Sequence, residues 1–103
     1  MSEYTSIKAE VLAKLKEHLP EIRERFGIQT LGIFGSVSRG EDTADSDVDI
    51  FYEFFPDKIS YDTFLDLYDY LETLLNHKIE MVSLGSMPQR FRMAVDCDMI
   101  PAM

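Results

Sequence analysis

The chain contains one cysteine and no tryptophan, and none of its apolar runs approaches the roughly 20 residues that a membrane span requires. Cys97 has no second cysteine to pair with, which excludes an internal disulfide, and a lone thiol is more often a small buried residue than a nucleophile. The first residues lack the apolar segment of a secretory signal. We therefore expect a cytoplasmic protein that does not enter the membrane.

Basic residues are scarce as well. Ten Lys and Arg stand against nineteen Asp and Glu, and the net charge of −9 has the wrong sign for binding a nucleic-acid backbone directly. Such acidity suits a metal site or a basic protein partner, and it is equally typical of a solvated acidic surface. At 103 residues the chain is expected to form a single domain over residues 1–103.

Helical periodicity dominates the first quarter of the chain. Apolar residues recur at helical spacing from Ser6 to Phe26, with Lys and Glu between them. Pro20 lacks an amide donor and crowds the preceding turn, so we expect one helix to end near His18 and a second, short helix to begin at Pro20. Gly27 is a suitable left-handed stop for the second helix.

Short runs rich in β-branched and aromatic residues predict the strands. They are IQTLGIF at 28–34, DVDIFYEF at 47–54 and HKIEMVSL at 77–84, followed by a short helix from about Pro88 and a terminal extended piece. A polar loop over residues 35–46, with one helical turn near 37–40, joins the first two strands. The order of elements predicts an α+β fold, in which helices cover one face of a small mixed sheet and the carboxylate-bearing face is open.

A second long helix separates the last two predicted strands, and Ser60 is a good N-cap for it. Its predicted apolar stripe consists of Tyr61, Phe64, Leu65, Tyr68, Leu71, Leu74 and Leu75. The aromatic residues between Phe51 and Tyr70 are most simply core residues. Exposed members of that set, and the methionine-containing tail at 87–103, are candidate partner surfaces that the sequence alone does not resolve.

Two aspartates stand one residue apart at the start of the second predicted strand. Because side chains alternate along a strand, Asp47 and Asp49 share one face and repel each other, and hard oxygen ligands of this kind suit Mg²⁺. Two solvated carboxylates on an exposed strand explain the pair equally well. Glu80 favours the metal site, because it is the only acidic residue of the third strand and a strand beside the second one brings it to the same cluster.

A glycine-rich turn follows the first predicted strand. Backbone amides at Gly35 and the hydroxyl of Ser36 are suited to an anion, although Gly-Ser turns are common in proteins without any such role. Arg39, followed by Gly40, is close enough in sequence to reach phosphate oxygens, or to pair with a nearby acidic residue of the loop. Three carboxylates and such a turn are the parts of a two-metal phosphoryl or nucleotidyl transfer site.

The stretch GSVSRGEDTADSDVDI at 35–50 resembles the signature of the nucleotidyltransferase superfamily that includes DNA polymerase beta. Over nearly its whole length the chain is similar to minimal nucleotidyltransferase (MNT) domain proteins, including the antitoxins that pair with HEPN-domain toxins. The resemblance implies a polymerase beta palm-like fold. It implies that Gly35, Ser36, Arg39 and Gly40 bind the nucleotide.

The same resemblance implies that Asp47, Asp49 and Glu80 are the catalytic and metal-binding residues, although the third position is more often aspartate in minimal members of the family. The expected activity is Mg²⁺-dependent transfer of a nucleoside monophosphate, AMP from ATP, to a hydroxyl of a partner protein, with two Mg²⁺ ions at the site. The expected partner is a HEPN-domain protein, in a homo- or hetero-oligomer. Two alternatives stay open: a non-catalytic module that masks a HEPN ribonuclease, and transfer to a small molecule such as an antibiotic.

Overall fold

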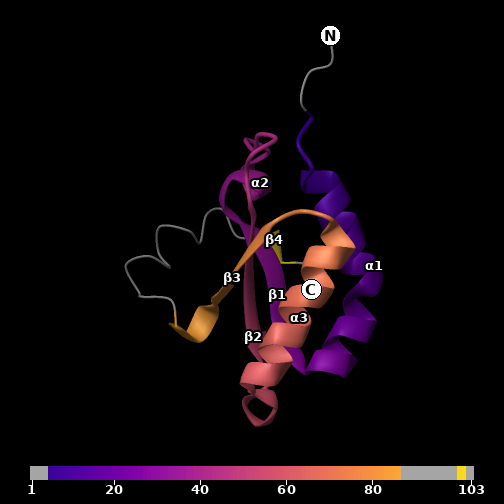
Figure 1. Cartoon of the computed structure of the whole chain (residues 1–103), viewed down its shortest axis with the longest axis vertical. Coiled ribbons are helices and arrows are strands. Elements are labelled where there is room, and N and C mark those ends of the chain that lie inside the picture. Colours follow the sequence, from indigo (N-terminus) through magenta and orange to yellow (C-terminus); the bar gives the residue numbers. More distant parts are fainter. Residues whose placement is uncertain (1–4, 87–99, 102–103) are drawn as a thin grey trace.

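The computed structural model describes residues 5–86 and 100–101, and Figure 1 shows their arrangement. The elements, in chain order, are α1 (Lys8–Phe26), β1 (Ile28–Phe34), α2 (Gly35–Arg39), β2 (Val48–Phe54), the 3₁₀ turn η1 (Pro56–Lys58), α3 (Tyr61–Leu75), β3 (Ile79–Ser83), the 3₁₀ turn η2 (Leu84–Ser86) and β4 (Ile100–Pro101). The three predicted strands are confirmed. The terminal extended piece is present as β4, whereas the helix expected from Pro88 lies outside the described residues.

The sheet has four strands in the order β3-β2-β1-β4. β1 is antiparallel to both of its neighbours, while β2 and β3 are parallel and are joined through α3. The predicted mixed sheet is confirmed. β2 occupies a central position, so that each of its residues has a partner on one or both sides.

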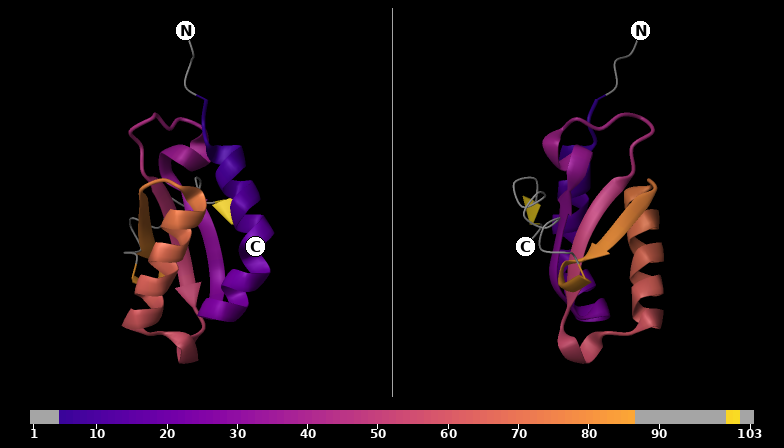
Figure 2. Two further views of the ribbon diagram at one scale, coloured as in Figure 1. Left: turned by 45° about the vertical axis from the view of Figure 1, so that its right-hand side comes forward. Right: turned by 90° about the vertical axis from the view of Figure 1, so that its left-hand side faces the viewer.

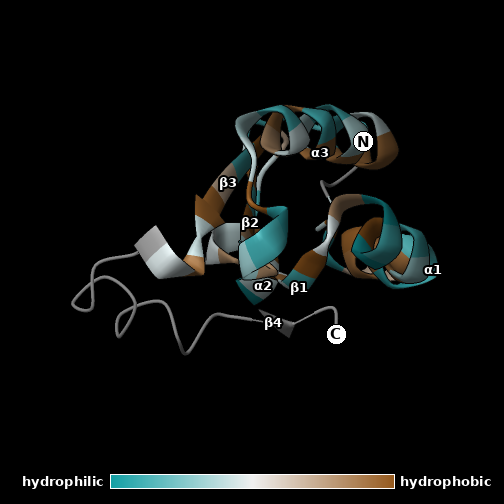
Figure 3. Ribbon diagram, turned by 90° about the horizontal axis from the view of Figure 1, so that it is seen from below, coloured by the Kyte–Doolittle hydropathy of each residue, from teal (hydrophilic) through white to brown (hydrophobic). Residues whose placement is uncertain are grey.

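Helices α1 and α3 lie side by side on one face of the sheet (Figures 2 and 3), as predicted. Their apolar stripes pack against alternate residues of the strands, because side chains at period two point to one face. The fully buried members of this core are Val11, Leu15, Ile22, Ile28, Leu31, Ile33, Val37, Val48, Ile50, Leu67, Leu71 and Leu75. Within the described residues, no helix is long and apolar enough to cross a membrane.

The opposite face of the sheet is less open than the sequence suggested. Phe34 of β1 and Phe51 of β2 are buried there together with Leu84 of η2, and Val82 packs against them. The prediction of an open face was therefore wrong over this part of the sheet, because η2 folds back over it after β3 ends. The carboxylates lie at the end of the same face where β2 begins.

Pro20 does not divide the first helix, contrary to the prediction. α1 is continuous through Pro20, which is exposed, whereas Leu15 and Ile22 on either side of it are fully buried. Burial of the apolar stripe on both sides holds the helix together despite the lost amide donor, since packing rather than propensity provides most helical stability. The predicted stop is confirmed: Gly27 has φ 68° and its N–H donates to the Arg23 carbonyl.

Helix α3 begins where the sequence predicted, because the Ser60 hydroxyl accepts a hydrogen bond from the Thr63 amide. Its buried stripe is rotated from the predicted one. Leu67, which the prediction omitted, is buried with Leu71 and Leu75, while Tyr61 and Leu65 are exposed. Tyr61 and Leu65 stay outside the core, whereas Phe64 between them packs against it and contacts the ring of Tyr52 of β2.

Candidate active site

Asp49 lies in the central strand, and its neighbours across the sheet determine what surrounds its carboxylate. It pairs with Phe34, the last residue of β1, and with Glu80 of β3. Paired residues of adjacent strands point to the same face of the sheet. The predicted carboxylates Asp49 and Glu80 are therefore neighbours, and Gly35, which directly follows Phe34, lies beside them.

Gly35 approaches Asp49 so closely that no other residue fits there. Its φ of 77° is in the left-handed region, and a Cβ placed on it would collide with the Oδ2 atom of Asp49. Gly35 also begins α2, where its carbonyl accepts a hydrogen bond of 2.7 Å from the Ser38 hydroxyl. The turn predicted to bind a nucleotide and the predicted metal ligand thus form one packed unit. Figure 1 shows α2 at the upper end of the sheet.

The electrostatic environment of Asp49 disfavours its ionised form. Burial is the largest cause that raises the pKa of its carboxyl; together with the negative charges of Glu80 and Asp47 and a hydrogen bond with Glu80, and against a lowering by the Arg39 guanidinium, it brings that pKa to about 6. The carboxylate of Asp49 therefore interacts electrostatically with both of the other predicted carboxylates. A cation between them would relieve this repulsion, and carboxylate oxygens are the ligands that Mg²⁺ prefers, so the residues present fit that ion chemically.

Asp47 lies further from the pair than the sequence suggested. It is exposed and precedes the first residue of β2, and among residues 5–86 and 100–101 no three acidic, His or Cys side chains form a group that could hold a metal ion. The structure brings Asp49 and Glu80 together and leaves Asp47 at the margin. Joint metal binding by all three stays a prediction.

Arg39 and Gly40 end the short helix that carries Ser36. The Arg39 Nε donates to Glu41 Oε2 at 3.2 Å, which is the structural role the sequence analysis had set beside phosphate binding. Arg39 also acts electrostatically on Asp49, so its guanidinium lies toward the carboxylate site. Gly40 has φ 71° and its N–H donates to the Val37 carbonyl, which closes α2. The nucleotide-binding role of these residues stays a prediction.

Asp42 is a residue of this region whose importance the sequence did not reveal. It is buried, with 6% of its surface exposed, and its carboxylate accepts hydrogen bonds from the Ser6 hydroxyl and from the Ile7 amide, the latter at 3.1 Å. It thereby ties the loop between α2 and β2 to the start of α1. No local signal could have found this contact, because its partners are 35 and 36 residues away in the chain.

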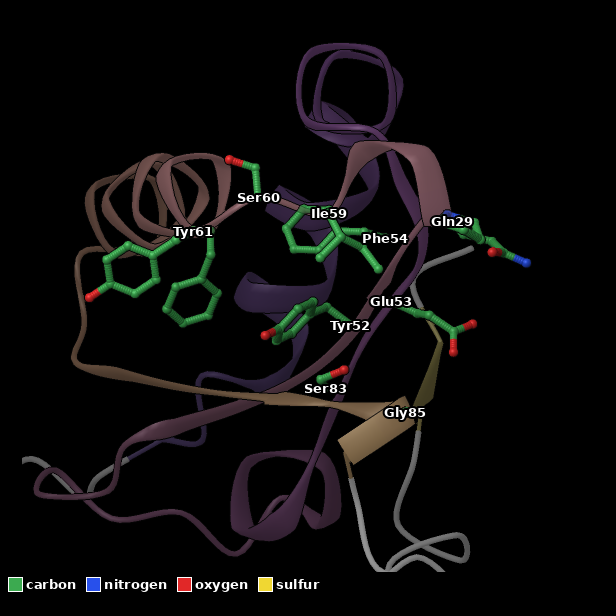
Figure 4. A pocket seen from close by; sticks show the side chains of 11 residues that line it. Gln29, Tyr52, Glu53, Phe54, Ile59, Ser60, Tyr61, Ser83 and Gly85 are labelled. Atoms are coloured by element: carbon green, nitrogen blue, oxygen red, sulfur yellow. The ribbon is translucent and has the colours of Figure 1, made fainter.

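A large cavity lies away from the carboxylates. It has a volume of about 680 Å³ and is lined by Tyr52, Glu53 and Phe54 of β2 and by residues of the first turn of α3 (Figure 4). It shares no residue with the predicted nucleotide or metal site. The carboxylate site is therefore a surface site at the start of β2, and the cavity belongs to the other end of that strand.

In sequence and fold the chain is similar to nucleotidyltransferases. Residues 14–99 match the family described as Polymerase beta, Nucleotidyltransferase. The protein adenylyltransferase MntA of Thermococcus cleftensis is 42% identical over 78 residues, which are 76% of this chain and 78% of that protein. A solved minimal nucleotidyltransferase has a TM-score of 0.76 and 32% identity, with 89% of this chain and 93% of that chain covered. A solved toxin-antitoxin complex with AMP-PNP has a TM-score of 0.64 and 18% identity, with 85% of this chain and 72% of that chain covered. At this low identity the likeness supports a shared fold and nothing more.

Proposed function

Because this chain belongs to the polymerase beta nucleotidyltransferase family, we propose that it transfers AMP from ATP to a hydroxyl of a partner protein. The observation that carries the proposal is the register of the sheet, which sets the Asp49 carboxylate between Gly35 and Glu80. A relative with 42% identity is named a protein adenylyltransferase, which supports AMP as the group moved and a protein as its acceptor.

The proposed chemistry divides the work between two groups of residues. Asp47, Asp49 and Glu80 would hold two Mg²⁺ ions, which would neutralise charge on the triphosphate and activate the acceptor oxygen. Gly35, Ser36, Arg39 and Gly40 hold the triphosphate by amides, a hydroxyl and the guanidinium. As the alternative to binding metal, the exposed Glu80 takes the proton of the acceptor hydroxyl.

In the proposed reaction the acceptor oxygen forms a bond to the α-phosphorus of ATP. The bond from that phosphorus to the oxygen bridging the α- and β-phosphates breaks, and pyrophosphate leaves with the electron pair. The hydroxyl proton passes to Glu80 or to water. The product is an AMP ester of the partner protein, and no oxidant or reductant is needed.

The proposed acceptor is a HEPN-domain toxin in the cytoplasm, with this chain as its antitoxin. A structural neighbour that binds AMP-PNP is a toxin-antitoxin complex, which supports a partner of that class. The net charge of −9 suits a basic protein partner better than a nucleic acid.

The test compares ATP labelled at the α-phosphate with ATP labelled at the γ-phosphate, in the presence of Mg²⁺ and a purified HEPN-domain protein. We expect the α-label alone to reach the partner, and Asp47→Ala/Asp49→Ala to lower the transfer rate by about 1,000-fold or more. Glu17→Ala/Glu24→Ala removes the same charge from exposed positions of α1 and is the matched control.

Three results would contradict the proposal. Transfer of the γ-label indicates phosphoryl rather than nucleotidyl transfer. If the Asp47→Ala/Asp49→Ala variant still transfers the label at the wild-type rate, these two carboxylates do not carry the reaction. Neutralisation of the toxin by that variant, without any transfer by the wild type, favours the non-catalytic masking module instead.

A further inference from the structure

The exposed apolar side chains of this protein are gathered in one short segment. Among the described residues, the large hydrophobic side chains that are exposed are Phe55, Ile59, Tyr61 and Leu65, and we call these four residues the apolar patch. Ile59 is 70% exposed and Tyr61 is 75% exposed. Single exposed apolar residues are ordinary, but four within eleven residues are a concentration of the kind that marks a binding surface.

The apolar patch borders the cavity of about 680 Å³. Ile59 and Tyr61 belong to both, and the cavity continues inward to Tyr52, Phe54 and Phe64. Figure 4 shows Tyr52 of β2 and Tyr61 of α3 among the side chains that line this space. A hollow lined by aromatic residues beside an exposed apolar rim can receive a large side chain from a partner, which is the usual form of a binding hot spot.

The charge around the apolar patch is negative. Asp57, Asp62 and Asp66 are exposed within the same segment, and Glu53 lines the cavity. Lys58 is the one basic residue between Phe55 and Leu65, and its aliphatic chain lies against the backbone of Gly27. Two copies of this chain meeting through the apolar patch would therefore bring like charges together, whereas a surface rich in Lys and Arg would be attracted.

We propose that the apolar patch and its cavity dock a protein whose surface presents an apolar anchor ringed by Lys and Arg. This inference rests on the proposed function and identifies the docked protein with the acceptor. Asp49 and Phe54 are five residues apart on β2, about 17 Å along the strand at its rise of 3.3–3.4 Å per residue, and their side chains point to opposite faces of the sheet. A folded protein spans this distance and a small molecule does not, so docking at this end selects a protein acceptor.

The experiment titrates the full chain with a purified HEPN-domain protein, the proposed acceptor, by calorimetry at low and high salt. Ile59→Ser/Tyr61→Ser removes two exposed side chains of the apolar patch, and we expect Kd to rise by about 30-fold or more. Asp62→Lys/Asp66→Lys should raise Kd most strongly at low salt. Glu17→Lys/Glu24→Lys makes the same change in net charge on α1 and is the matched control.

Wild-type chain that does not bind this protein, or patch variants that bind it as tightly as the wild type, would overturn the docking proposal. So would wild-type chain that self-associates in sedimentation while the Ile59→Ser/Tyr61→Ser variant does not, since the occupant would then be a second copy. A Tm of that variant well below the wild-type value would show instead that the apolar patch packs within the fold.

The failure of docking and the failure of the proposed function give different results. If docking is right, the patch variant keeps wild-type affinity for Mg²⁺-ATP and regains label transfer when the partner concentration exceeds the raised Kd. If the proposed function fails, no α-label reaches the partner, although the patch variants still weaken its binding.

Discussion

The two ends of β2 differ sharply in the chemistry of the side chains around them. At its start, Asp49 lies among Gly35, Glu80 and Asp47, in a polar environment where like charges are held close together. At its end, Tyr52 and Phe54 line a cavity bordered by exposed apolar side chains. One rigid strand thus carries a site suited to anions and cations at one end and an apolar docking surface at the other. A residue change at one end should therefore leave the other end functional.

Among single substitutions, the largest effect is expected from Gly35→Ala, because the new methyl group must displace the Asp49 carboxylate. A displacement of about 1 Å at a reacting centre costs about 100-fold in rate, and we expect a loss of that size in AMP transfer. Binding of the partner at the apolar patch should change little. Transfer rate and calorimetric Kd, measured on the same preparations, show whether the two ends are independent.

Gly40→Ala is the matched comparison for this experiment. Gly40 has nearly the same left-handed φ, but a Cβ there meets no atom within 4 Å. Both variants lose about 1–2 kcal/mol of stability to the backbone conformation. We expect Gly40→Ala to lose far less activity than Gly35→Ala. Equal losses would show that backbone strain, and not the approach to Asp49, is responsible.

A smaller effect is expected from Asp42→Ala, which removes the carboxylate that ties the loop before Asp47 to the start of α1. We expect the free energy of unfolding to fall by about 1–2 kcal/mol, as for the loss of a helix cap. Asp42→Asn keeps one acceptor oxygen, so we expect it to lower the free energy of unfolding by less than Asp42→Ala does. Chemical denaturation measures both, and a change within about 0.5 kcal/mol, typical of a surface substitution, would contradict this role.

The smallest effect concerns pH. The pKa of Asp49 is about 6 in the folded protein and 3.8 ordinarily, so the folded state binds its proton more tightly than the unfolded state. Without metal, ionisation of Asp49 therefore lowers stability as the pH rises from about 4 to 6, and the full penalty is present above pH 6. In a chelator, Asp49→Asn should stabilise the protein at pH 8 by about 1 kcal/mol, after allowance for solvent screening, and have no effect below pH 4.

Thermal unfolding across this pH range provides the measurement. Glu80→Gln removes the neighbouring charge. Because Glu80 is the main charged group that raises the pKa of Asp49, this variant should lose stability over a narrower pH range than the wild type. Mg²⁺ should stabilise the wild type more than Asp49→Asn at pH 8, since binding to the folded state alone adds stability. Equal stabilisation of both proteins by Mg²⁺ would place the ion away from Asp49.

Local sequence determined much of the fold and the candidate residues of the carboxylate site. The period of two predicted the strands, including the one that carries the two aspartates, and the period of 3.6 predicted the helices. Ser60 and Gly27 predicted one helix start and one helix end. These features act over a few residues, so the local sequence is sufficient to find them. Only the tertiary structure decided the continuity of α1 through Pro20, the burial of Leu67 in place of Tyr61 and Leu65, and the hydrogen bonds of Asp42 to Ser6 and Ile7 just before α1. It also decided which exposed aromatic side chains gather beside a cavity, since each of these depends on elements that meet across the fold and on the burial that results.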